Sequence, residues 1–169
     1  MAYLYFDHQD QSAQQPATVF ACVLRQLLDQ QPGIPNAVSR MYDSVGPNGK
    51  LPQAECRTSI AGLVKRLGRV YLVFDALDEC ASEYRASFLQ TLGQLSQVPG
   101  LRLLVTSRPH IQEIATAFTR RVDLKIAARG DDIKLYLEQE LKKNGIYDVA
   151  DEKFASGLIY KLTQGADGM

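Results

Sequence analysis

The chain has 169 residues, enough for one domain with a sizeable core, or for one domain and the start of another. Its 19 basic and 19 acidic side chains balance, and no stretch gathers enough Lys and Arg to follow a phosphate backbone, which disfavours nucleic acid and acidic membrane surfaces as partners. The sequence has no apolar run near the ~20 residues that span a bilayer, no signal-peptide pattern and no C-x-x-C pair. We therefore expect a soluble, reduced, cytoplasmic protein.

Hydrophobic periodicity predicts a strand and then helices in the first part of the chain. The strand is rich in aromatic residues, which we assign to core and sheet packing, and it leads into a polar loop. Two helices have clear apolar faces, and one or two further helical turns are expected in the loop-like stretch between them. The predicted strand covers residues 2–6, the two helices 16–31 and 53–67, and the helical turns 37–42.

The second part of the chain alternates strands and helices. Strands are predicted at 70–74 and 101–106, with a helix between them that begins at Ser82 as its N-cap. A short helix at 111–118 precedes the alternating segment 122–126, which is typical of a strand with one less buried face. Two amphipathic helices follow, at 131–144 and 154–162. The fold class is therefore α/β with a parallel sheet in residues 1–128, followed by the start of a helical subdomain in 129–169.

Acidic and basic side chains follow two neighbouring strands where each strand ends. Asp75, Asp78 and Glu79 come after five apolar residues, and Arg108 follows the next strand in the run Thr106-Ser107-Arg108-Pro109. A right-handed crossover brings the carboxyl ends of parallel strands to one edge, where ligands bind. There, Asp75 can hold Mg²⁺, a later carboxylate can orient water, and the guanidinium can detect a terminal phosphate. A helix cap or a solvated loop is the alternative for Asp75 alone.

Residues 70–79 and 103–109 resemble the Walker B and sensor segments of NACHT-type P-loop NTPases. These belong to the STAND group and include fungal NLR-like receptors and the nephrocystin-like N-terminal module. The resemblance implies a P-loop NTPase-like sheet flanked by helices, with Asp75 as the Mg²⁺-linked acid and Arg108 as the γ-phosphate sensor. It also implies that Asp78 or Glu79 positions water, and that Thr106 and Ser107 belong to the nucleotide site. Many family members have Gly where this chain has Ala76, a substitution that is tolerable unless the backbone there needs a positive φ.

The phosphate-holding loop of that family, G-x-x-x-x-G-K-[ST], has no counterpart in this sequence. The Gly49-Lys50 pair is followed by Leu51 and has the wrong glycine spacing, so we interpret it as a surface turn. We expect the chain to begin at the second strand of the family's sheet, leaving 101–106 with an unpaired edge and 122–126 without its neighbour. ATP or GTP with Mg²⁺ is then expected to bind only in a full-length parent, and this chain alone is expected to be inactive.

There are two alternatives to a nucleotide-binding function. The chain can instead be a non-catalytic interaction module that forms homo-oligomers or associates with related receptor chains, with its open sheet edge as the contact. A hydrolase using Ser107 or Cys80 has no supporting spacing. The run that begins with Asp7 and His8 contains metal-ligating residue types but only one histidine, and a polar loop is the favoured interpretation.

Overall fold

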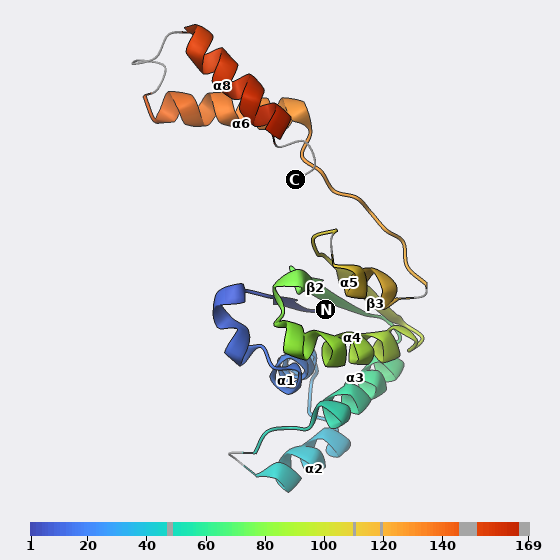
Figure 1. Cartoon of the computed structure of the whole chain (residues 1–169). Coiled ribbons are helices and arrows are strands. Elements are labelled where there is room, and N and C mark those ends of the chain that lie inside the picture. Colours follow the sequence, from blue (N-terminus) through green and yellow to red (C-terminus); the bar gives the residue numbers. More distant parts are fainter. Residues whose placement is uncertain (47–48, 110, 119, 146–151, 166–169) are drawn as a thin grey trace. The chain divides into compact units, whose positions relative to one another are not determined.

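The computed structural model of the protein describes residues 1–46, 49–109, 111–118, 120–145 and 152–165 (Figure 1). The chain divides into two compact units, Met1–Arg121 and Val122–Met169. The domain boundary expected after residue 128 stays a prediction.

The first unit contains a parallel sheet of three strands in the order β1-β2-β3. The strands are β1 (Ala2–Tyr5), β2 (Val70–Asp75) and β3 (Leu101–Val105). Tyr5 lies opposite Asp75, and Phe74 lies opposite Val105, so the carboxyl ends of all three strands meet at one edge. The predicted fold class, α/β with a parallel sheet and flanking helices, is confirmed.

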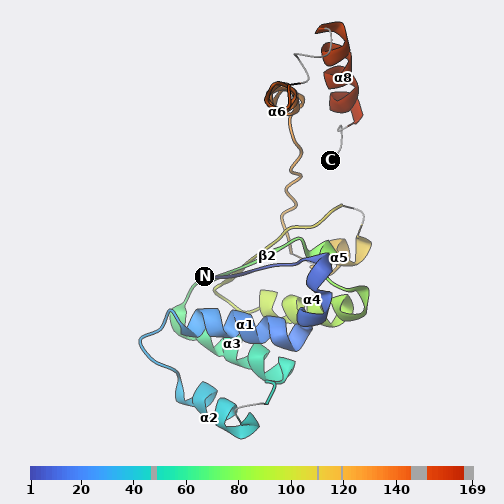
Figure 2. The same ribbon diagram turned by 90° about the vertical axis from the view of Figure 1, so that its left-hand side faces the viewer.

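Four α-helices and two short 3₁₀ turns connect these strands within the described residues, and a fifth α-helix follows β3. Each begins and ends close to the turn residues of the sequence; α3, for example, ends where Gly68 takes a φ of 74°. Ser82 is the first residue of its helix, and Ala81 occupies the N-cap position, so the predicted cap was wrong by one residue. Figure 2 shows α1 and α3 side by side on one face of the sheet. The elements are η1 (His8–Ala13), α1 (Pro16–Leu28), α2 (Asn36–Val45), α3 (Gln53–Leu67), η2 (Leu77–Glu79), α4 (Ser82–Ser96) and α5 (Gln112–Thr116).

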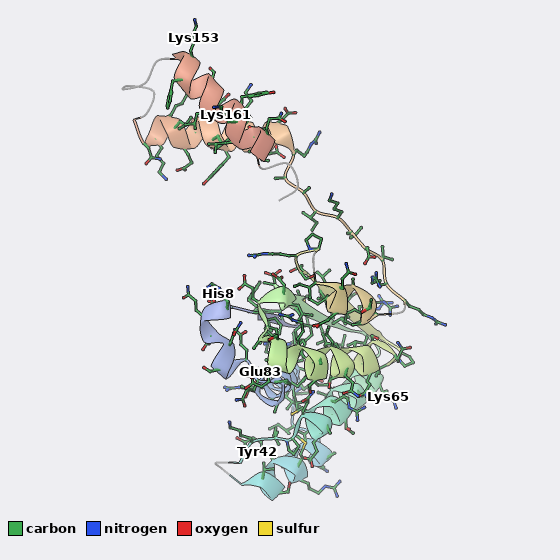
Figure 3. The ribbon with its side chains drawn as sticks, in the orientation of Figure 1. His8, Tyr42, Lys65, Glu83, Lys153 and Lys161 are labelled. Atoms are coloured by element: carbon green, nitrogen blue, oxygen red, sulfur yellow. The ribbon has the colours of Figure 1, made fainter. Side chains whose placement is uncertain are left out.

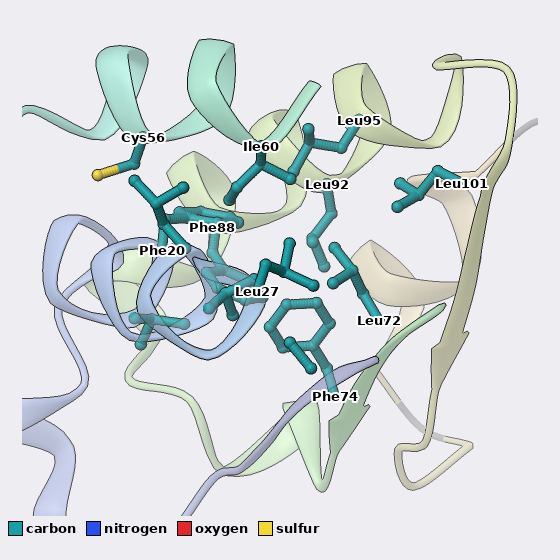
Figure 4. Close-up of a cluster of buried hydrophobic side chains, with 14 of the residues drawn as sticks. Phe20, Leu27, Cys56, Ile60, Leu72, Phe74, Phe88, Leu92, Leu95 and Leu101 are labelled. Atoms are coloured by element: carbon teal, nitrogen blue, oxygen red, sulfur yellow. The ribbon is translucent and has the colours of Figure 1, made fainter. Parts of the chain in front are cut away.

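The hydrophobic core lies between the sheet and helices α1, α3 and α4. Alternate residues of β2 point into it, ending at Phe74, which is fully buried. Its ring lies edge-to-face with that of Phe88 at 5.2 Å, and Phe20 stacks on Phe88 at 5.0 Å (Figure 4). This aromatic cluster joins α1, β2 and α4 and fixes the end of β2 that carries the acids.

The opposite face of the sheet is open to solvent. Tyr3, Tyr5, Tyr71 and Leu104 project from it and are 50%, 65%, 49% and 53% exposed. No helix within the described residues of the first unit covers this face. The assignment of Tyr3 and Tyr5 to the core was therefore wrong, because strand alternation turns them away from the helices; Phe6, 4% exposed, is the aromatic residue that enters the core.

The outer edge of β1 is closed by two glutamine side chains of α1. The Gln26 amide accepts from Tyr3 N–H at 3.0 Å and donates to Tyr3 C=O at 2.8 Å. One turn later, the Gln30 amide accepts from the Met1 amino group at 2.9 Å and donates to Met1 C=O at 2.7 Å. Each amide thus takes the place of a residue in a neighbouring strand, so the outward-facing backbone groups of Met1 and Tyr3 are not free to pair with another chain.

The outer edge of β3 has no such cover in the part of the chain that the structure describes. Gly100 C=O accepts from Val70 N–H, and Thr106 N–H donates to Phe74 C=O, both at 3.0 Å, so these alternate residues face β2. The backbone groups of Leu103 therefore point away from β2, as strand alternation requires. This agrees with the expectation of an unpaired edge.

The described residues of the second unit form two packed helices, α6 (Gly130–Lys143) and α8 (Glu152–Gly165). Leu141, Ala155 and Ile159 are buried in it, at 6%, 0% and 6% exposure. The predicted strand at 122–126 was wrong: this segment has no regular structure, and Val122 and Ile126 are 85% and 87% exposed. Alternation alone does not make a strand, because a strand also needs a neighbour to complete its hydrogen bonds, and no described strand pairs with this segment.

Candidate functional site

The candidate site lies at the carboxyl edge of the sheet, where β2 and β3 end. Asp75 is the last residue of β2 and is partly buried. Thr106, just after β3, donates its hydroxyl proton to Asp75 Oδ1 and accepts from the Ala76 N–H at 2.9 Å. The second carboxylate oxygen of Asp75 has no hydrogen-bond partner among the described residues. A carboxylate with one oxygen fixed and one available fits a Mg²⁺ ion, held directly or through water.

A tight left-handed turn carries the chain from Asp75 to the next two acids. Ala76 takes φ 53° and ψ 45°, a conformation that strains any residue with a Cβ. The turn is fixed on its other side by Leu77, which is fully buried and whose N–H donates to Thr106 C=O at 3.0 Å. The backbone at residue 76 thus requires the positive φ under which alanine is unfavourable.

Arg108 and Asp78 form the tightest charged pair of the site. The Arg108 N–H donates to Asp78 Oδ1 at 3.1 Å, and its Nε lies 3.4 Å from Asp78 Oδ2. Arg108 Nη2 also lies 4.0 Å from Glu79 Oε1. The Asp78 side chain is 8% exposed and that of Arg108 is 69% exposed. The predicted acids and arginine are therefore brought together, with the arginine paired to the acids and its outer side open to solvent.

Arg85 on α4 holds the backbone of the turn that carries Asp78 and Glu79, a role that the sequence did not predict. Its Nη2 donates to the carbonyl oxygens of Asp78 and Cys80 at 3.0 and 2.8 Å. Its Nη1 lies 3.7 Å from Glu113 Oε2 on α5. An arginine in the polar half of a predicted helix carries no signal for such a role, because its partners are backbone carbonyls.

Glu79 lies between Arg108 on one side and the loop after β1 on the other. Its Oε2 accepts from the His8 N–H at 3.2 Å and lies 3.6 Å from His8 Nδ1. Figure 3 labels His8 at the start of η1, directly after β1. The contact between Glu79 and His8 was also missed by sequence reasoning, because the two residues are 71 positions apart.

The remaining predicted residues contribute less to this cluster. Ser107 is exposed, and no hydrogen bond or ion pair links it to the acids within the described residues. Cys80 is buried, and burial raises the pKa of its thiol, with the nearby Arg85 charge acting in the opposite direction. A neutral, inaccessible thiol is a poor nucleophile. His110 lies outside the described residues.

The site is an open edge rather than an enclosed pocket. A hollow of about 450 Å³ lies elsewhere, between α4 and α5, with Glu113 at its rim. Asp75, Asp78 and Glu79 are not among the residues that line it. The surface turn predicted around Gly49-Lys50 includes Pro47 and Asn48, which lie outside the described residues. The arrangement offers oxygen atoms that could hold a dication and a guanidinium that could meet a phosphate, and no row of backbone N–H groups suited to a triphosphate lies beside them among the described residues.

A three-stranded parallel sheet flanked by helices, with acids and an arginine at its carboxyl edge, places the first unit in the class of α/β domains. Within this class, the family model "Nephrocystin 3, N-terminal" matches residues 1–108. The chain therefore belongs to the nephrocystin 3 N-terminal family. Comparisons with curated proteins and with solved structures yield no match. None of the described helices combines the length and apolar character needed to cross a bilayer.

Proposed function

We propose that the chain is the part of a NACHT-like nucleotide switch that positions Mg²⁺ and reads the terminal phosphate of ATP or GTP. The observation that carries this proposal is the convergence of Asp75, Asp78 and Arg108 at one edge of the sheet. Membership of the nephrocystin 3 N-terminal family supports it. Nucleotide binding would also need a phosphate-holding loop, which these 169 residues do not contain.

Each residue has a separate task in this proposal. Asp75 binds the Mg²⁺ shell through its available oxygen, and Thr106 keeps the carboxylate oriented. The exposed Arg108 guanidinium breaks its ion pair with Asp78 and contacts the γ-phosphate. Asp78 and Glu79 then accept hydrogen bonds from water instead of from the guanidinium. The ion pair between Arg108 and Asp78 is thus the resting state of the phosphate sensor.

The proposal can be tested by fusing the P-loop strand and helix of a related family member to the N-terminus. Asp75→Ala in this fusion should abolish Mg²⁺-dependent hydrolysis, and Arg108→Ala should reduce the preference for triphosphate over diphosphate. Asp43→Ala, an exposed acid on α2, is the matched control and should leave both properties unchanged. Unchanged hydrolysis and nucleotide preference in both site variants would contradict the assignment.

The open edge of β3 favours a second function, association with chains that carry the same module. Since Gln26 and Gln30 cover the β1 edge at Tyr3 and Met1, the edge of β3 is the more open place for an added strand among the described residues. A saturable complex formed without nucleotide, measured by analytical ultracentrifugation, would favour this function. Leu104→Lys places a charge beside that edge and should dissociate the complex. Leu135→Lys, at a similarly exposed leucine of α6, should not.

A further inference from the structure

We propose that Asp7, His8 and Glu79 form a binding site for a divalent transition-metal ion of the Zn²⁺ type. One carboxylate oxygen of each acid and one imidazole nitrogen all lie within 4.8 Å of one another. The loop after β1 supplies two of these ligands, and the turn after β2 supplies the third. The residues around Asp7 supply too few ligands for a metal site by themselves, and the fold adds Glu79 as the third ligand residue.

The two distances from the imidazole nitrogen to the carboxylate oxygens are close to those of a tetrahedral zinc site. His8 Nδ1 lies 3.6 Å from Asp7 Oδ1 and 3.6 Å from Glu79 Oε2. Both separations are longer than a hydrogen bond. Zinc bonds to nitrogen and oxygen are roughly 2.0–2.2 Å, which places tetrahedral ligand atoms about 3.3–3.6 Å apart. Both distances from the imidazole nitrogen match this geometry, and the ligand atoms of Asp7 and Glu79 lie within 4.8 Å of each other, so the remaining adjustment is between the two carboxylates.

Hydrogen bonds already orient the two carboxylates toward the imidazole. Glu79 Oε2 accepts from the His8 backbone N–H at 3.2 Å, and Asp7 Oδ1 accepts from the Gln9 N–H at 2.8 Å. Gln11 Nε2 donates to the Glu79 carbonyl at 3.0 Å and fixes the backbone there. Each carboxylate oxygen has a second lone pair, so these contacts leave room for a metal bond. Such outer contacts are what hold metal ligands in place.

Charge and ligand type select the ion. Two carboxylates match the charge of a dication, and an imidazole nitrogen favours Zn²⁺ and similar metals over Mg²⁺. The Asp7 and His8 side chains are 60% and 68% exposed, so an ion can enter and keep water in its fourth position. The nearest guanidinium, that of Arg108, lies 4.0 Å from the other oxygen of Glu79 and opposes the ion.

The test is a titration of the full chain with Zn²⁺ by calorimetry, in the absence of nucleotide. Cys22→Ser serves as the background, because this exposed thiol is a competing ligand. We expect one Zn²⁺ per chain and a loss of affinity of at least ~10-fold in His8→Gln. His110→Gln, which changes the other histidine of the chain, is the matched control and should leave the affinity unchanged. Arg108→Gln should tighten binding, because it removes the opposing charge.

A Co²⁺ titration gives an independent measure, since a tetrahedral Co²⁺ ion with nitrogen and oxygen ligands absorbs visible light. The absorption should appear in the Cys22→Ser background and disappear in His8→Gln, while the far-UV circular dichroism of both proteins stays the same. No saturable Zn²⁺ binding would overturn the proposal, as would equal affinities of His8→Gln and its background, or an equal loss in His110→Gln. Because no nucleotide is present, these results are independent of the proposed nucleotide switch.

Discussion

Replacing Ala76 by glycine should stabilise the protein, although glycine usually destabilises. The φ of 53° at this residue costs a side chain with a Cβ about 1–2 kcal/mol. Glycine removes that cost but makes the unfolded chain more flexible, which costs roughly 0.4–1 kcal/mol, and it loses a half-buried methyl group, about 0.4 kcal/mol. The expected net gain is about 0.5 kcal/mol in the free energy of unfolding. Urea denaturation followed by circular dichroism and tyrosine fluorescence measures it, since the chain has eight tyrosines and no tryptophan.

Ala86→Gly is the matched control for this prediction. Ala86 is exposed in the middle of α4, where the same substitution should cost about 1 kcal/mol. The two variants should therefore shift the urea midpoint in opposite directions. If Ala76→Gly destabilises the protein as much as Ala86→Gly does, the strained turn at the acidic edge is not present in solution.

Three further predictions concern stability and association. Burial, and then the Glu55 charge, raise the pKa of the Cys56 thiol to about 11, above its ordinary value of 9.0. The stability linked to keeping this thiol neutral in the folded state is fully present below pH 9 and is lost as the pH rises to 11, about 2–3 kcal/mol in all. Cys56→Ala should therefore make the free energy of unfolding, measured by urea titration, fall less steeply over this pH range. Gly100→Ala would place a Cβ 2.3 Å from the Gly68 carbonyl oxygen and should lower the melting temperature, whereas Gly62→Ala, in open space on α3, should raise it. Gln26→Ala with Gln30→Ala frees the β1 edge and should increase the mass measured by light scattering; an unchanged mass would contradict the edge-closing role.

The helices and the two central strands could be predicted because their hydrophobic periods are regular. The helix at 53–67 has the predicted bounds, and β2 differs by one residue. The convergence of Asp75, Asp78 and Arg108 also followed from topology, since parallel strands joined by a crossover helix end at one edge. These inferences need only local pattern and the handedness of the connection.

The sequence could not reveal features that depend on partners distant in the chain. The contact between His8 and Glu79, the carbonyl contacts of Arg85 and the closing of β1 by Gln26 all join residues with no recognisable spacing. The failed strand at 122–126 shows the converse, because a correct alternation gave no strand where no neighbour pairs with it. Tyr3 and Tyr5 were misplaced for a related reason: aromatic content does not tell which face of a sheet the helices cover.

The central claim is that this chain positions Mg²⁺ and reads a terminal phosphate but does not hold the triphosphate itself. Calorimetric titration of the 169-residue chain with Mg²⁺–ATP and Mg²⁺–GTP tests it most directly. We predict no saturable binding of either nucleotide, because these 169 residues contain no phosphate-holding loop and the Arg108 guanidinium is paired with Asp78. Saturable binding with a micromolar dissociation constant would contradict the account.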